Sequence, residues 1–442
     1  MKKAIDFQSL TRHIRDCPLP VSRGRVLAVS ELTIEAEVVG ARVGLGVTVE
    51  SPGRPRVPAE VAACDGLRVT LIPLGNTLGI GPGDPVTIDP NKTDSIPCGF
   101  DLLGRIIDPL ARPLDGRELP LLPQWSLNRE PPNPLSRNPI NQQLVTGIRS
   151  LDACLSLGVG QRFGIFAGPG LGKSTLLADL AKCAEIDISV ICLVGERGRE
   201  VREFLDNKLG KGGLARSVVV LATADTPPVI RLRALKAATA ISEWFRGHGK
   251  RVLLLVDSLT RILRAGRDMA LALGEPQARG GFPASVFASL PSLLERTGHD
   301  EKGSITAGYA VLTEGYSEDP IAEEARSLLD GHIVLSTKLA KKAQWPAIDI
   351  LNSISRVMES VASKTHLANT RRLRRMIAAL ETNDDLIKMG AYQRGSCPVT
   401  DLAISRSKEI SDFLTQGRQP CSIDDTLNQL TSIVRQSRRK TR

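Results

Sequence analysis

The chain has 442 residues, 42% of them hydrophobic, and a formal net charge of +10 at pH 7. This length predicts about two to four domains with packed cores. The longest apolar runs, at 190–194 and 252–256, fall far below the length of about 18 residues that a membrane helix needs, and the N-terminus lacks the apolar segment of a secretory signal. The eight cysteines and five histidines show no metal-ligand spacing, so we expect reduced thiols, a cytoplasmic protein and no structural metal.

The first two segments of the chain differ in pattern. Residues 1–18 are predicted to form a short helical arm, because Leu10 and Ile14 share one helical face. Residues 19–92 contain short β-rich runs separated by Gly and Pro turns, which is typical of a small barrel or sandwich. The runs lie at 25–29, 32–39, 47–49 and 67–72.

The rest of the chain is predicted to contain an α/β domain and a helical domain. Residues 93–360 begin with a Pro-rich linker and continue, from about residue 161, with strands that alternate with helices, a pattern typical of a mainly parallel sheet. The expected strands lie at 163–167, 189–194, 217–222, 251–256, 304–311 and 332–335. Residues 361–442 are expected to form a helical C-terminal domain that ends in a basic tail.

Residues 167–175, Ala-Gly-Pro-Gly-Leu-Gly-Lys-Ser-Thr, join a predicted buried strand to a predicted helix. In this spacing Lys173 can reach the terminal phosphates of a nucleotide, and Ser174 can ligand the accompanying Mg²⁺. Ala167 replaces the usual first glycine of the motif. The cradle around the phosphates is predicted to consist of Gly168, Pro169, Gly170, Leu171 and Gly172. The alternative is a glycine-rich turn with a chance lysine, but the agreement of strand, loop and helix favours a phosphate-binding loop.

Asp257 follows the apolar run 251–256, which is predicted to be a buried strand. A carboxylate at the carboxyl end of such a strand can hold Mg²⁺ through water. The alternative role is a helix N-cap, since Asp257 and Ser258 precede an apolar helical pattern. We favour metal support, and both roles are compatible.

Glu196 and Arg356 are candidates for the chemistry of hydrolysis. Glu196 follows the run 191–194, where a carboxylate can polarise the attacking water, and Arg197 beside it can contact the terminal phosphate. A solvent-exposed charged turn is the alternative. Arg356 is a candidate for an arginine finger that reaches the active site of a neighbouring subunit. The alternative is a surface salt bridge.

Seven longer strings lie at 195–204, 257–261, 274–276, 283–287, 290–296, 329–335 and 346–349. Together they resemble the ATPases of type III secretion systems, a family that covers injectisomes and the flagellar export apparatus and is related to the catalytic subunit of rotary ATP synthases. The resemblance spans nearly the whole chain. It implies the fold class α/β, with a RecA-like P-loop core on a mainly parallel sheet, a small N-terminal β-barrel and a helical C-terminal domain.

The resemblance also implies a homohexameric ring with ATP and Mg²⁺ bound between subunits. The residues it carries over are Lys173 and Ser174 for phosphate and Mg²⁺, Thr175 beside them, Glu196 as general base, Arg197 as phosphate contact, Asp257 as second-strand carboxylate and Arg356 as finger. Trp345 stands where the family has an adenine-stacking Tyr. Thr337 and Cys397 depart from the family pattern at the interface and in the C-terminal domain. Because one chain carries both base and finger, identical copies can close a ring by head-to-tail contacts.

The implied partners belong to a protein export apparatus at the cytoplasmic face of the inner membrane. The resemblance places stator contact at the N-terminal arm, a central stalk in the pore, and chaperones and exported proteins at the C-terminal domain, with peripheral membrane contact. The amino-acid sequences at 293–296 and 320–324 favour an injectisome over a flagellar system.

Three rival functions remain: a ring-shaped nucleic-acid translocase, a rotary ATPase subunit and a non-enzymatic scaffold. Strand binding on barrels uses aromatic platforms, and no aromatic residue lies between Phe7 and Phe100, so no nucleic-acid partner is expected. The joint presence of Glu196, Arg356 and the string at 195–204 argues against a rotary subunit. Intact Glu196, Asp257 and Lys173 argue against a scaffold. The basic clusters at 371–375 and 435–442 favour acidic partners, with a solvated helix face and a frayed tail as alternatives.

Overall fold

The computed structural model describes residues 23–89, 95–313 and 319–435. The chain divides into two compact units, Met1–Ser95 and Ile96–Arg442, each considered by itself. In the described ranges no helix is long and apolar enough to cross a membrane. The predicted helical arm at 1–18 and most of the basic tail lie outside the described residues.

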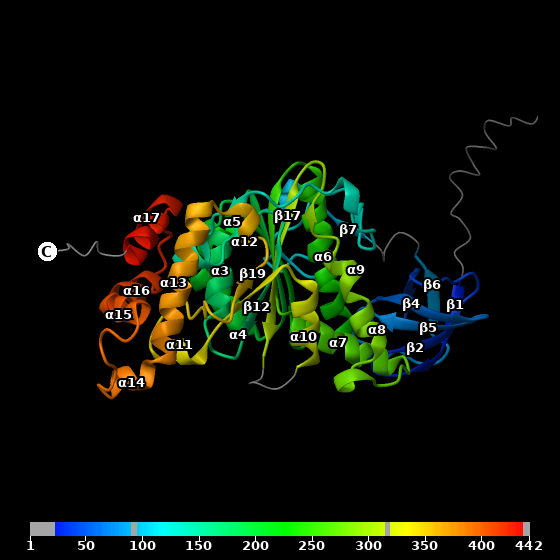
Figure 1. Cartoon of the computed structure of the whole chain (residues 1–442). Helices are drawn as coiled ribbons and strands as arrows, with labels where there is room; N and C mark the ends of the chain where they lie inside the picture. Colours follow the sequence, from blue (N-terminus) through cyan, green and yellow to red (C-terminus); the bar gives the residue numbers. More distant parts are fainter. Residues whose placement is uncertain (1–22, 90–94, 314–318, 436–442) are drawn as a thin grey trace, which may run out of the picture. The chain divides into compact units, whose positions relative to one another are not determined.

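The first unit contains a closed barrel in the strand order β1-β2-β5-β4-β3-β6 (Figure 1). Its strands are β1 Arg23–Val29, β2 Ile34–Glu37, β3 Gly46–Val49, β4 Val57–Asp65, β5 Arg68–Pro73 and β6 Pro85–Ile88. Inward-pointing residues such as Val26, Ile34 and Leu71 form its buried core. The predicted small β domain is therefore a barrel. The sequence analysis missed β4 and β6, because Pro58 and Pro85 interrupt their apolar alternation.

The second unit is built on a nine-stranded sheet in the order β19-β18-β12-β17-β15-β13-β14-β8, with β16 also paired to β17. The strands are β8 Arg105–Ile107, β12 Arg162–Ala167, β13 Ile188–Glu196, β14 Ser217–Thr223, β15 Arg251–Asp257, β16 Gly298–His299, β17 Ser304–Leu312, β18 Gly331–Val334 and β19 Ile354–Ser355. All pairings are parallel except those of β16 and β19. Burial on both faces explains the continuous apolar runs, and the predicted α/β core is confirmed.

The Pro-rich linker contributes more regular structure than the sequence suggests. Its strand β8 extends the main sheet by pairing with β14, and β7 Ser95–Pro97 pairs with β9 Gln124–Ser126. Three-residue strands carry too little periodicity to be recognised in a proline-rich segment. The short elements nearby are η1 Phe100–Leu102, η2 Pro134–Ser136, β10 Gln143–Leu144 and β11 Leu157–Gly158.

Helices cover both faces of the sheet (Figure 1). On one side lie α3 Lys173–Cys183 and α5 Gly210–Ala215, and on the other lie α6 Pro228–Gly247 and α7 Leu259–Ala272. The remaining helices of this region are α2 Arg149–Cys154, α4 Gly198–Glu203, the π-helix η3 Phe204–Leu209, η4 Arg279–Gly281, α8 Ala284–Ala288, α9 Leu290–Leu294, α10 Pro320–Leu328 and α11 Thr337–Lys341.

The C-terminal region is helical, as predicted, and shares a buried core with the sheet domain. It comprises α12 Met358–Val361, α13 Lys364–Thr382, α14 Asp384–Lys388, α15 Pro398–Ser405, α16 Ser407–Leu414 and α17 Ile423–Val434. Leu373, Ile410 and Leu430 belong to the same apolar cluster as Leu151 of α2. The side chain of Thr370 donates to the carbonyl of Ala153, also on α2. The C-terminal helices α13, α16 and α17 therefore pack directly against α2.

A buried ion pair links α6 to the segment after α9. The side chains of Glu243 and Arg296 are only 3% and 5% exposed, and two hydrogen bonds of 2.8 and 2.7 Å join them. Glu243→Gln should lower the free energy of unfolding by about 3 kcal/mol, because it leaves the Arg296 charge buried without a counterion. Urea titration of the purified variant measures this loss.

The matched control for this pair is Glu359→Gln. Glu359 pairs with Arg371 on the surface, where the side chains are 76% and 64% exposed. Solvent screens that pair, so the change should cost less than about 1 kcal/mol. Equal losses from the two variants would contradict the structural role of the Glu243 pair.

Candidate active site

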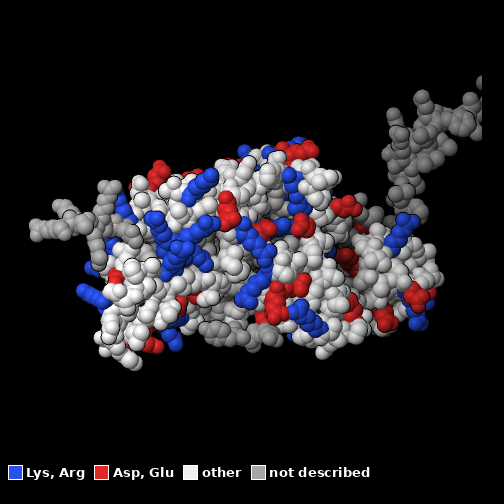
Figure 2. All heavy atoms as spheres, in the orientation of Figure 1, with Lys and Arg blue, Asp and Glu red and all other residues white. Residues whose placement is uncertain are grey.

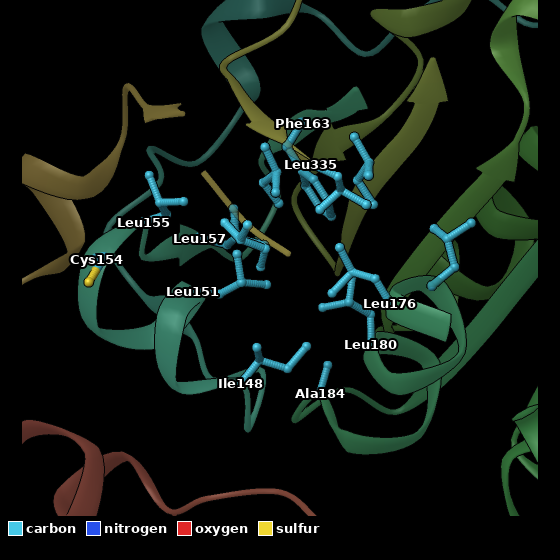
Figure 3. Close-up of a cluster of buried hydrophobic side chains, with 14 of the residues drawn as sticks. Ile148, Leu151, Cys154, Leu155, Leu157, Phe163, Leu176, Leu180, Ala184 and Leu335 are labelled. Carbon is cyan, nitrogen blue, oxygen red and sulfur yellow. The ribbon is translucent and has the colours of Figure 1, made fainter. Parts of the chain in front are cut away.

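The phosphate loop, residues 168–172, connects β12 to α3. Gly170 and Gly172 have φ angles of 76° and 82°, in the left-handed region that glycine adopts without strain. The helix α3 begins at Lys173, directly after the loop. Figure 3 shows Leu176 and Leu180 of α3 facing the interior that Leu151 of α2 also fills, so apolar packing fixes the helix behind the loop.

The loop faces a cavity of about 820 Å³. The lining includes seven of the predicted phosphate-loop residues, namely Gly168, Pro169, Gly170, Gly172, Lys173, Ser174 and Thr175, and also Glu196, Arg197 and Asp257. Leu171 instead turns to a second cavity on the other side of the loop. The first N–H groups of α3 add the partial positive charge of a helix N-terminus to the wall that these residues form.

Lys173, Asp257 and Glu196 converge at the carboxyl edge of the sheet. Asp257 ends β15, and Glu196 ends the neighbouring parallel strand β13. The Nζ of Lys173 donates to Oδ1 of Asp257 at 2.5 Å and lies 3.9 Å from Oε1 of Glu196. The three side chains are between 3% and 11% exposed, so their charges are little screened by solvent. The acidic residues of the site therefore neutralise the charge of Lys173.

Asp257 is not a helix N-cap. The cap of α7 is Ser258, whose hydroxyl accepts a hydrogen bond from the backbone N–H of Arg261. The alternative role considered from the sequence is therefore wrong. The carboxylate of Asp257 lines the phosphate cavity, and the next residue, Ser258, caps the helix instead.

A β-bulge aims the side chain of Glu196. The pairing of β13 with β14 shifts register between Val194 and Glu196, and the intervening Gly195 has a φ of 70°. A Cβ atom on Gly195 would lie 2.7 Å from Cδ of Arg261, so both conformation and packing require glycine there. The guanidinium of Arg261 donates to the carbonyl of Gly195 at 2.6 Å and pairs with Glu196 at 2.7 Å. Arg261 thus holds the carboxylate in place.

The surroundings of Glu196 raise the pKa of its carboxyl group. Burial raises the pKa of Glu196, and the nearby Asp257 carboxylate raises it further, while Arg261 and Lys173 oppose the change. A side-chain hydrogen bond between Glu196 and Glu200 lowers the pKa of Glu200. Of the two glutamates, Glu196 and Glu200, Glu196 is therefore the one that takes up a proton more readily. This is the property required of a general base.

The second cavity, of about 410 Å³, lies on the other side of the loop and is lined by Leu171 and Trp345. The Trp345 side chain is 41% exposed, and its ring packs against Gly172, where an added Cβ would lie 3.0 Å from the ring. A partly exposed aromatic plane beside an apolar cavity can stack on a planar base. The two cavities together have the dimensions and chemistry of a site for a base at one end and phosphates at the other.

Arg197 and Arg356 are not drawn into this cluster. The Arg197 side chain is 82% exposed on the cavity rim and lies 3.9 Å from Glu200. Arg356 follows β19, which pairs with the first residues of β18, so it lies at the amino edge of the parallel sheet, opposite the phosphate loop. It is exposed, donates to the carbonyl of Arg326 at 3.4 Å and lines neither cavity. It does not reach the phosphate cavity of its own chain.

The basic cluster of α13 lies mainly on the surface. Figure 2 shows Lys and Arg side chains gathered where α13 runs in Figure 1. Arg371, Arg372 and Arg375 are exposed, while Arg374 donates to the carbonyls of Leu351 and Ser353. These contacts fit the solvated helix face that the sequence analysis considered for this cluster.

The sequence analysis did not identify three residues that line the phosphate cavity. Arg261 lies four residues after Asp257 in a recognised string, yet nothing local indicates that it pairs with Glu196. Lys208, on the π-helix η3, and Arg418, from the C-terminal region, also line the phosphate cavity. No signal in the sequence connects Arg418 with a loop about 245 residues earlier.

A phosphate loop, two acidic residues and a lysine at the carboxyl edge of a parallel sheet define the class of P-loop nucleotide hydrolases. Residues 147–355 match the ATP synthase alpha/beta family, nucleotide-binding domain, and residues 362–432 match the T3SS EscN ATPase C-terminal domain. The chain belongs to the family of type III secretion and flagellar export ATPases, as the sequence resemblance indicated, and it hydrolyses ATP.

Similar proteins cover nearly the whole chain. The flagellum-specific ATP synthase of Pseudomonas aeruginosa is 49% identical over 405 residues, which are 90% of each chain. The SPI-2 type 3 secretion system ATPase of Salmonella typhimurium is 46% identical, over 93% of this chain and 94% of the relative. The assembled ATPase EscN from the type III secretion system of enteropathogenic E. coli has a TM-score of 0.87 at 43% identity, covering 93% of this chain and 100% of EscN.

Proposed function

We propose that this chain is the ATPase of a type III export apparatus and that it works as a homohexameric ring. The observation that carries the proposal is the combination of a complete P-loop site with a C-terminal region of the T3SS EscN kind, residues 362–432. EscN is described both as an assembled ATPase and in complex with its central stalk EscO. By analogy, the partners are a central stalk, a stator, chaperones and exported proteins, at the cytoplasmic face of the inner membrane.

In the proposed site, ATP occupies both cavities of the chain. Adenine stacks on Trp345, and the phosphates lie over the loop at Lys173. The negative triphosphate competes with Asp257 for the lysine, so ATP binding frees the Asp257 carboxylate. Glu196, held by Arg261, then accepts a proton from the water that attacks the γ-phosphate.

The donor set of the phosphate cavity suits Mg²⁺. The hydroxyl of Ser174 and the carboxylate of Asp257 both line the cavity, and such hard oxygen donors are the groups that Mg²⁺ prefers. We propose that these two residues hold the ion, Asp257 through water. When bound with ATP, the ion neutralises charge on the phosphates.

Arg356 completes the proposed site from the neighbouring copy. Its position at the opposite edge of its own sheet and its exposure support action in trans. Arg197, on the cavity rim, is proposed to contact phosphate after ATP binds. Each copy then supplies Glu196 to its own site and Arg356 to the next, so identical copies can close a ring by head-to-tail contacts.

The type of export system is also part of the proposal. The strings at 293–296 and 320–324 support an injectisome. Relatives named for flagella and relatives named for type III secretion have similar identities to this chain, between 43% and 49%. A flagellar export ATPase is therefore the second candidate, and the experiment below includes both.

Complementation of cells that lack the gene tests the export function. Wild-type protein should restore export and Lys173→Ala should not, because the variant lacks the cation for the ATP phosphates. Immunoblots of the medium for injectisome effectors and for flagellar filament protein measure each system. Lys182→Ala is the matched control, since Lys182 lies on the same helix and pairs with Asp179 at 3.2 Å. Export that persists at wild-type level with Lys173→Ala would refute the proposed function.

A further inference from the structure

A short segment of the C-terminal region, residues 416–420, forms part of the wall of both cavities. All five of its residues line the base-side cavity together with Trp345, and Arg418 also lines the phosphate cavity. The other residues common to the two linings are Gly170, Gly172 and Thr175, which belong to the phosphate loop and the first turn of α3. Arg418 therefore stands where the two cavities meet.

Hydrogen bonds fix this segment to the sheet domain at both ends. The backbone N–H of Gln416 donates to the carbonyl of Trp345, and its side-chain amide donates to the carbonyl of Gly147, each at 2.8 Å. The backbone N–H of Arg149 donates to the Gln416 side chain at 2.8 Å. On the far side, the N–H of Cys421 donates to the same carbonyl of Gly147 at 2.9 Å. The backbone on either side of Arg418 is thus held against the cavity wall.

The guanidinium of Arg418 makes no hydrogen bond or ion pair with any other residue that the structure describes, and it is exposed. Three other cations around the phosphate cavity differ in this respect, whereas Arg199 likewise has no hydrogen bond or ion pair among the described residues. Lys173 pairs with Asp257, Arg261 with Glu196, and Lys208 with Glu203 at 3.3 Å. A guanidinium that is anchored through its backbone but has no carboxylate partner keeps its donors available for phosphate oxygens.

We propose that Arg418 binds the phosphates nearest the ribose, α and β, of the nucleotide held by its own chain. The junction of a base cavity and a terminal-phosphate cavity is the place of the ribose and these two phosphates, since the base and the γ-phosphate occupy the far ends. ADP retains both groups, so the contact persists after hydrolysis. It ties the segment between α16 and α17 to the bound nucleotide. This inference rests on the proposed ATP site.

Calorimetric titration of the full chain with adenosine, ADP and ATP, in the presence of Mg²⁺, tests the assignment. Arg418→Ala should weaken ADP and ATP binding by the same factor, about tenfold, as expected for the loss of a hydrogen bond to a charged group. Adenosine affinity should stay unchanged, because the base cavity is intact. Arg418→Lys should recover part of the loss. Arg394→Ala, another exposed arginine of the C-terminal region that lines neither cavity, should bind all three ligands like wild type.

Each other result has a defined meaning. An equal loss for adenosine would indicate that the segment has collapsed, and a loss confined to ATP would place the guanidinium at the γ-phosphate; either overturns the assignment. Unchanged ADP and ATP affinities in Arg418→Ala would overturn this inference and leave the proposed function standing. A wild-type chain that binds neither ADP nor ATP would overturn both.

Discussion

Glu196→Gln should lower the rate of ATP hydrolysis by about 10³-fold, within the range of about 10²–10⁴ known for general bases. The amide keeps the size of the side chain and its place beside Arg261 but cannot accept a proton from water. ATP affinity should be retained or increased, because a carboxylate beside the terminal phosphate is removed. Phosphate-release assays and equilibrium titration measure the two effects separately.

The pH profile gives an independent reading of the same residue. Because burial raises the pKa of Glu196 above the ordinary value of 4.5, the base becomes ionised only at higher pH. The wild-type rate should therefore rise with pH through a midpoint above 4.5, and this limb should be absent from the residual rate of Glu196→Gln.

The control for Glu196 is Glu203→Gln on the same cavity wall. The Glu203 carboxylate already pairs with Lys208, so its replacement should change the rate by less than about threefold. If the two variants lose activity equally, or if Glu196→Gln loses ATP binding as well, the assignment of Glu196 as base is wrong.

Arg356→Ala should lower hydrolysis by about 10³-fold without changing ATP affinity in the isolated chain, because the guanidinium lies far from the phosphate cavity of its own chain. Wild-type activity should depend steeply on protein concentration, since only neighbouring copies complete a site. Arg356→Lys should not restore the rate, as an ammonium lacks the planar donor pair of a guanidinium.

Mixing Arg356→Ala with Glu196→Gln provides the decisive test. Each variant alone lacks one half of every site. In a ring assembled from equal amounts, about one interface in four combines an intact Glu196 with an intact Arg356, as random head-to-tail order requires. The mixture should therefore recover about a quarter of wild-type turnover. No recovery, with mixed rings verified by native mass spectrometry, would show that the two residues do not share a site.

The sequence predicted the elements that are determined by short stretches of neighbouring residues. Buried parallel strands have continuous apolar runs, and the phosphate loop has a fixed spacing, so β12, β13, β15 and Lys173 were all recognised. Glu196 and Asp257 followed from their places at strand ends. These features need no knowledge of distant parts of the chain.

What the sequence did not reveal depends on register and on long-range packing. The bulge at Gly195 is a property of two paired strands, and the pairing of Arg261 with Glu196 depends on that bulge. Arg418 reaches the cavities because Gln416 and Cys421 are tied to Gly147, far away in the chain. The strand β8 was missed because three residues carry no usable periodicity.

The sheets described above also constrain how copies of this chain can adhere to one another. The barrel is closed, and the outer strands of the large sheet, β19 and β8, have only 2 and 3 residues. In the described ranges neither sheet therefore offers a long template of free backbone amides and carbonyls for strand addition. In the proposed ring, contacts between copies would then be made mainly by side chains, which can repack more easily than a shared backbone ladder.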